Sequence, residues 1–133
     1  MKLLRLTPAL KATSSSYNQF SLGFKESIDQ TIGSLHKHEV SIDEKITVFH
    51  GDGSALKMLK QIKRFIHQIE YDVIHIHNGV TGIIFILAIF PFKIGLLKKT
   101  VFTLHNSWNV LKTRNKFFNL IVMLLSSKVC TCG

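Results

Sequence analysis

Two short apolar segments of this sequence end in polar side chains that can do chemistry. The segments cover residues 71–78 and 100–106, and their polar side chains are His75, His77, Asn78, His105 and Asn106. Each segment is rich in β-branched residues and closes with a His-Asn pair, which is typical of a buried parallel strand whose carboxyl end opens into a ligand crevice. Imidazole and amide groups at such an edge can hydrogen-bond phosphate or sugar oxygens, or stabilise developing charge.

His75 and His77 lie two residues apart on a predicted strand, so we expect both side chains on one face of the sheet. Two interpretations remain open. In the first, the His-x-His pair binds a metal ion with His105 as a further donor, as in a metal-dependent hydrolase. In the second, one of the two histidines is packed and hydrogen-bonded at the strand end and only the other reaches the crevice. Because a metal site needs a third and a fourth ligand, we assign no metal ligand.

The elements that position these residues alternate between strands and helices. Four further strands are predicted over residues 3–7, 30–35, 45–50 and 129–131, and helices over 17–24, 55–70, 79–92 and 113–125. This alternation predicts an α/β fold, a Rossmann-like parallel sheet with helices on both faces. The 133 residues are enough for one domain with a single core.

Phosphate-binding signatures are missing from the loops. The sequence has neither the glycine pattern of a dinucleotide fold nor a phosphate-loop lysine motif. Gly51-Asp52-Gly53 is interpreted as a plain turn, after which Ser54 or Asp52 caps the helix that follows. The loop after the first strand is a second place for ligand contacts, because the amino end of the next helix can face an anion or a hydroxylated substrate.

Composition narrows the classes of partner and compartment. The hydrophobic fraction of 46% excludes a disordered chain. A net charge of +9 suits anionic partners such as nucleoside diphosphates or an anionic membrane surface. The basic residues do not form one dense block, and we expect no nucleic acid partner. Cys130 and Cys132 are too close to form an unstrained disulfide. No apolar run reaches the length of a membrane span. We therefore expect a cytoplasmic location, at the inner face of the membrane.

The order of these segments resembles the amino-terminal domain of GT-B glycosyltransferases, the retaining group that uses nucleotide-sugars. The resemblance is carried by residues 4–8, 17–22, 49–54, 71–77 and 102–106 and extends over nearly the whole chain. It implies one half of a GT-B fold, the acceptor-side half, with the donor-binding carboxyl-terminal domain outside residues 1–133.

The resemblance also implies the site and the reaction. The histidine that matches His105 lies in the family near the transferred sugar, which makes His105 the candidate catalytic residue. The candidate substrate-binding residues are Ser15, Ser16, Tyr17, Asn18, His77, Asn78 and Asn106. No cofactor is implied, and a nucleoside-diphosphate sugar is the co-substrate. The implied partners are a glycan or lipid-linked acceptor, a second domain or polypeptide that binds the donor, and an anionic membrane surface.

Two other interpretations stay open beside transfer of a hexose to that acceptor. One is an inactive truncated fragment or binding module, because the donor-binding half is not among these residues. The other is the metal-dependent hydrolase that would use the His-x-His strand.

Overall fold

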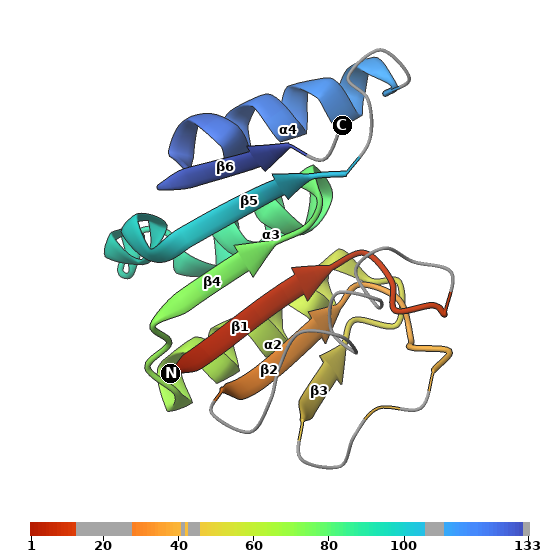
Figure 1. The fold of residues 1–133 in the computed structure, drawn as a ribbon, viewed down its shortest axis with the longest axis vertical. Coiled ribbons are helices and arrows are strands. Elements are labelled where there is room, and N and C mark those ends of the chain that lie inside the picture. Colours follow the sequence, from red (N-terminus) through yellow and green to blue (C-terminus); the bar gives the residue numbers. More distant parts are fainter. Residues whose placement is uncertain (13–27, 41, 43–45, 106–110, 132–133) are drawn as a thin grey trace.

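A parallel β-sheet organises the part of the chain that the structure, a computed structural model, describes: residues 1–12, 28–40, 42, 46–105 and 111–131. Within these residues six strands are arranged in the order β3-β2-β1-β4-β5-β6 (Figure 1). They are β1 (Lys2–Thr7), β2 (Asp29–Ser34), β3 (Thr47–His50), β4 (Val73–Ile76), β5 (Thr100–Leu104) and β6 (Lys128–Thr131). The expected α/β, Rossmann-like fold is confirmed, and each expected strand is present with no end shifted by more than two residues.

The strand order reverses between β1 and β4. From β1 the chain moves outward to β2 and β3, and then returns to place β4 on the other side of β1, where Leu4 lies opposite both Thr31 of β2 and Ile74 of β4. Open parallel sheets bind their ligands at such a reversal, outside the carboxyl ends of the strands. The backbone N–H of His77 donates to the Leu6 carbonyl oxygen at 2.9 Å, so His77 is held at this point.

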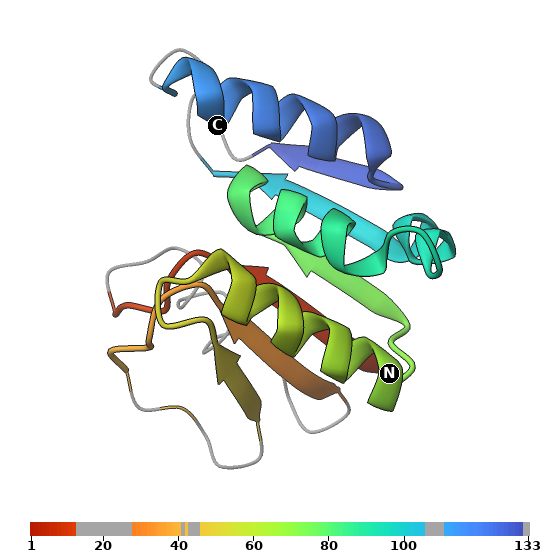
Figure 2. The same cartoon turned by 180° about the vertical axis from the view of Figure 1, so that it is seen from behind.

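The α-helices of the described residues cover one face of the sheet. They are α2 (Ala55–Gln68), α3 (Gly79–Ile89) and α4 (Thr113–Leu125), and a 3-10 helix, η1 (Ile94–Lys99), precedes β5. Figure 2 shows all three α-helices in front of the strands. Helices α2, α3 and α4 connect β3 to β4, β4 to β5 and β5 to β6, and right-handed crossovers that run in one direction along a sheet lie on the same face. The helix expected over 17–24 lies outside the described residues. None of the described helices has the length and apolar composition needed to cross a bilayer.

The main core lies between the sheet and these helices. Side chains that alternate along the central strands point toward the helices and are at most 1% exposed; they are Leu4, Leu6, Ile74, Ile76 and Phe102. The helices contribute Met58, Ile62 and Phe85, each with no exposed surface. Because alternate residues of a strand point to opposite faces, the remaining residues of these strands occupy the other face.

The amphipathic pattern of α2 explains its position. Ser54, one of the two cap residues that the sequence offered, accepts a hydrogen bond from the backbone N–H of Lys57 at 3.3 Å. Met58, Ile62 and Ile66 recur every four residues and are the buried residues of the helix. These residues therefore form one apolar stripe that faces the core, as in an amphipathic helix.

Helix α3 is shorter than its apolar sequence suggested. It begins after Asn78, whose side-chain oxygen accepts from the backbone N–H of Val80 at 2.7 Å. The helix was expected to continue to Phe92, but it ends at Ile89. Pro91 accounts for the difference, because the residue before a proline is driven out of helical geometry. The apolar composition of residues 79–92 does not by itself predict where the helix ends.

Two glycines of α3 allow α4 to pack closely against it. A Cβ atom on Gly79 would lie 2.7 Å from the backbone nitrogen of Asn119, and one on Gly82 would lie 2.8 Å from Cγ1 of Val122. Asn119 and Val122 are the buried residues of α4. The absence of a side chain at these two positions therefore sets the distance between the helices.

Substitution Gly79→Ala is expected to lower the free energy of unfolding by about 1–3 kcal/mol, the usual cost of overpacking. The added methyl group meets the backbone nitrogen of Asn119 at 2.7 Å, which no side-chain rotation can move. Urea denaturation measures the effect. Gly95→Ala in η1 is the matched control, because a Cβ there meets nothing within 4 Å; equal midpoints for the two variants would contradict the prediction.

Candidate functional site at the carboxyl edge of the sheet

The face of the sheet opposite α2, α3 and α4 carries polar side chains at the centre of the sheet. We call this surface the polar face; it comprises Arg5 and Thr7 of β1, His75 and His77 at β4, and Thr103 and His105 at β5. Arg5, Thr7, His77 and Thr103 are no more than 5% exposed. Burial of so many polar groups costs free energy unless they are hydrogen-bonded, so the contacts among them are informative.

His77 and His105 form a direct hydrogen bond between neighbouring strands. Nδ1 of His77 lies 2.8 Å from Nε2 of His105, and the two rings are nearly parallel, with an interplanar angle of 12°. His77 is buried, whereas His105 is partly exposed at the strand end. Imidazoles that follow two adjacent strands therefore meet at the carboxyl edge of the sheet. We refer to these residues as the histidine pair.

A second hydrogen bond joins the two strands next to the histidine pair. Nε2 of His75 lies 2.7 Å from Oγ1 of Thr103, which repeats the same connection between β4 and β5 two residues earlier. The rings of His75 and His77 are in contact, with centroids 4.0 Å apart. Both histidines therefore share a face, as expected. Of the two, His77 is the more buried, and both are hydrogen-bonded.

Burial keeps these imidazoles neutral. It lowers the pKa of His75 to about 4, with repulsion from Arg5 and His105 adding to the shift. The pKa of His77 falls to about 2, first through burial and then through repulsion from His75, His105 and Arg5. Burial also lowers the pKa of His105. In a neutral pair one ring nitrogen donates and the other accepts, so the tautomers of the two rings are linked.

Arg5 adds a positive charge to the polar face. Its neighbour across the β1–β4 ladder is His75, and its side chain is 3% exposed. Burial lowers the pKa of Arg5 to about 10, which leaves the guanidinium charged at neutral pH. Sequence reasoning did not select Arg5 as a site residue. The signal was a charged residue within the apolar run Leu3–Leu6, because an isolated charge in a central strand is rarely placed there without a partner.

The other candidate substrate-binding residues are divided between two situations. The side chain of Asn78 caps α3, and the backbone carbonyl oxygen of Asn78 accepts a hydrogen bond from Thr81 Oγ1 at 2.9 Å. Asn78 therefore has a structural role at the edge of the site. The remaining candidates lie outside the described residues: Ser15, Ser16, Tyr17, Asn18 and Asn106. The structure thus brings together His77, Asn78 and His105.

The geometry of the histidine pair suits a hydrogen bond better than a shared metal ion. Two nitrogen ligands at about 2.0–2.1 Å from a tetrahedral zinc ion would lie farther apart than 2.8 Å, and here the two nitrogens bond to one another. Within the described ranges, no three His, Cys, Asp or Glu side chains are grouped to hold a metal ion. The single described cysteine, Cys130, is exposed on β6.

Comparison with known proteins adds no family to this description. No protein-family model matches the sequence, and no curated protein matches it. The site therefore has to be interpreted from its own geometry.

Proposed function

We propose that these residues form the acceptor-side domain of a GT-B glycosyltransferase, which transfers a hexose from a nucleoside-diphosphate sugar to a glycan or lipid-linked acceptor. The observation that carries this proposal is the histidine pair, which lies next to the reversal of strand order at the carboxyl edge of the sheet. Such an edge is where open α/β sheets bind their ligands.

In the proposed reaction the bond between the anomeric carbon and the diphosphate oxygen breaks, and a new bond forms to the acceptor hydroxyl oxygen. The acceptor hydroxyl passes its proton to an oxygen of the departing diphosphate, and the nucleoside diphosphate leaves. His105 is the partly exposed member of the pair and contacts the transferred sugar or the departing phosphate. His77 is hydrogen-bonded to Nε2 of His105, so His77 fixes the orientation of the His105 ring. The same bond couples the tautomer of His105 to the tautomer of His77.

The charge of the protein fits the proposed partners. An anionic membrane surface would attract a chain with a net charge of +9, and exposed Lys57, Lys60 and Arg64 lie on one side of α2. In this proposal a donor-binding domain or second polypeptide completes the transferase, and the membrane surface brings the protein near lipid-linked acceptors.

Acceptor binding can be tested with the 133-residue chain alone. A glycan array identifies an oligosaccharide that binds, and NMR titration then follows the imidazole signals. We expect the signals of His105 and His77 to shift with saturation, and those of the exposed His67 on α2 to remain unchanged. Shifts that leave His105 unaffected, or no oligosaccharide bound at millimolar concentration, would contradict an acceptor site at the histidine pair.

A further inference from the structure

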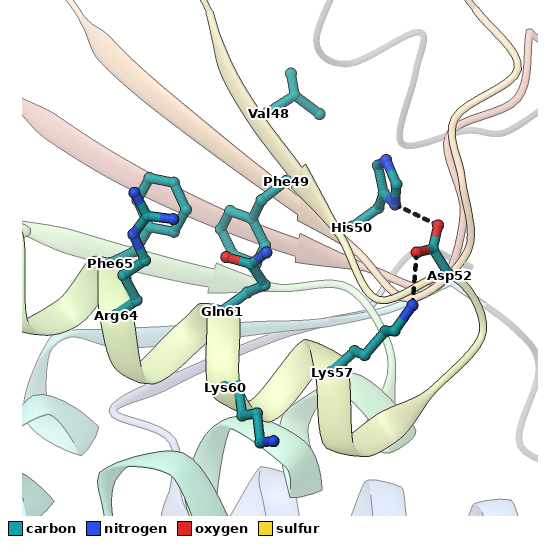
Figure 3. Close-up of a pocket in the computed structure, with 9 residues that line it drawn as sticks. All are labelled: Val48, Phe49, His50, Asp52, Lys57, Lys60, Gln61, Arg64 and Phe65. Atoms are coloured by element: carbon teal, nitrogen blue, oxygen red, sulfur yellow. Dashed lines mark hydrogen bonds and ion pairs between the residues drawn. The ribbon is translucent and has the colours of Figure 1, made fainter.

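A groove lies between the edge strand β3 and helix α2, away from the histidine pair. Its volume is about 610 Å³, within the range of small-ligand sites. Figure 3 shows the side chains that line it: Val48, Phe49, His50, Asp52, Lys57, Lys60, Gln61, Arg64 and Phe65. Strands β2, β1 and β4 separate β3 from β5 in the sheet, so this groove is distinct from the site at the histidine pair.

The α2 wall of the groove is cationic over two helical turns. Lys57, Lys60 and Arg64 follow at intervals of three and four residues, which places them on one side of the helix. Asp52 is the only carboxylate among the lining residues. The lining therefore has an excess of two positive charges and favours an anion.

The turn before α2 holds two of the polar groups in place. Oδ2 of Asp52 lies 3.2 Å from Nζ of Lys57, and Oδ1 lies 2.8 Å from Nδ1 of His50. Figure 3 shows Lys57 and His50 on either side of this carboxylate. The turn that carries Asp52 has positive φ angles of 52° at Asp52 and 78° at Gly53. The turn predicted at Gly51–Gly53 is thus confirmed, and it also orients a lysine and a histidine.

An aromatic pair forms the apolar part of the groove. The rings of Phe49 and Phe65 stack with centroids 4.6 Å apart and an interplanar angle of 15°. Gly33 on β2 leaves room for the Phe49 ring, because a Cβ at that position would overlap it. Phe65 is partly exposed, so the stack offers an apolar surface beside the cationic wall.

We propose that this groove binds a phosphate group attached to an apolar or aromatic body. Lys57 and Arg64 contact the phosphate oxygens, and the body of the ligand lies against Phe65. A guanidinium and an ammonium group form charge-assisted hydrogen bonds with phosphate. The phosphate belongs either to a free ester of nucleotide size or to a lipid headgroup, and the two sources can be distinguished by experiment.

Isothermal titration calorimetry with ATP, at 150 mM salt, tests the free ester. We expect saturable binding of one ATP per chain, weakened about tenfold by Lys57→Ala and by Arg64→Ala, as expected for loss of one charge-assisted hydrogen bond. Lys63→Ala is the matched control, because Lys63 is exposed on the same helix, carries the same charge and does not line the groove. We expect it to change the affinity less than twofold.

Vesicle co-sedimentation tests the headgroup. Phosphatidylcholine vesicles with and without phosphatidylglycerol are compared for the native protein and the same three variants. Binding that requires phosphatidylglycerol and is lost in Lys57→Ala and Arg64→Ala, but not in Lys63→Ala, assigns the phosphate to a lipid. The proposal is overturned if neither ATP nor these vesicles bind, or if Lys63→Ala weakens binding as much as Arg64→Ala. Neither result bears on acceptor binding at the histidine pair.

Discussion

Acidification from pH 6.5 to pH 4.5 is expected to remove about 5 kcal/mol of the free energy of unfolding. The cause is the burial of His75 and His77, whose pKa values in the folded chain are lowered to about 4 and about 2. An unfolded histidine has a pKa of about 6.5. Between these values the unfolded chain binds more protons than the folded one, so protons favour unfolding.

The direction and the pH window follow from these shifts. The stabilising effect of the neutral histidines is complete above pH 6.5 and decreases as the pH falls toward the folded pKa values. Each histidine contributes a loss of about 1.4 kcal/mol per pH unit in this window, and domains of this size have only about 5–15 kcal/mol in total. Protonation would also place new positive charge beside Arg5, which has no means of losing its own charge at these pH values.

Urea denaturation at pH 7.0, 6.0, 5.0 and 4.5 measures this loss directly. We expect the midpoint to fall steeply below pH 6.5 in the native protein. The double variant His75→Gln/His77→Gln removes both titrating groups, so its midpoint should depend less on pH even if the variant is less stable at pH 7. His67→Gln removes an exposed histidine of α2 and should leave the slope unchanged. A native midpoint that is constant from pH 7 to pH 4.5 would contradict the prediction.

Local patterns were sufficient to predict the strands and most of the helices. The apolar stripe of α2, with its turn and cap, defines that helix without reference to the rest of the fold. Likewise, β4 and β5 were recognisable because each apolar run stops at a His-Asn pair. Two errors have local causes. Pro91 ends α3 earlier than its apolar residues suggest, and η1 is too short to give a periodic signal.

The contacts within the site depend on long-range information that no local pattern carries. His77 meets His105 only because β4 and β5 are neighbours in the sheet, and that order is decided by packing of the whole domain. The position of Arg5 beside His75 depends in the same way on the β1–β4 register. The groove on β3 was missed because its two walls come from a strand and a helix whose polar residues, taken separately, look like solvated surface.

Replacement of His105 is expected to have the largest effect on activity. If the proposed transferase is assembled from this chain and a donor-binding domain, we expect His105→Ala to lower its kcat at least about 100-fold, the low end of what a positioned acid, base or charge-stabilising group contributes. His105 is partly exposed, so truncation should affect folding much less than removal of a core residue. Transfer of labelled hexose from a nucleoside-diphosphate sugar measures the change.

The histidine pair makes a second, graded outcome possible. His77→Ala leaves the ring of His105 without its 2.8 Å contact, whereas His77→Gln retains a side-chain amide that can hydrogen-bond to it. We therefore expect kcat to fall more in His77→Ala than in His77→Gln, with a changed pH profile in both, because the tautomer of His105 is linked to its partner. His67→Ala should behave as the native enzyme. If His105→Ala retains activity within twofold of the native enzyme, the pair is a structural contact between β4 and β5, and the reaction must be supported by other groups at the carboxyl edge.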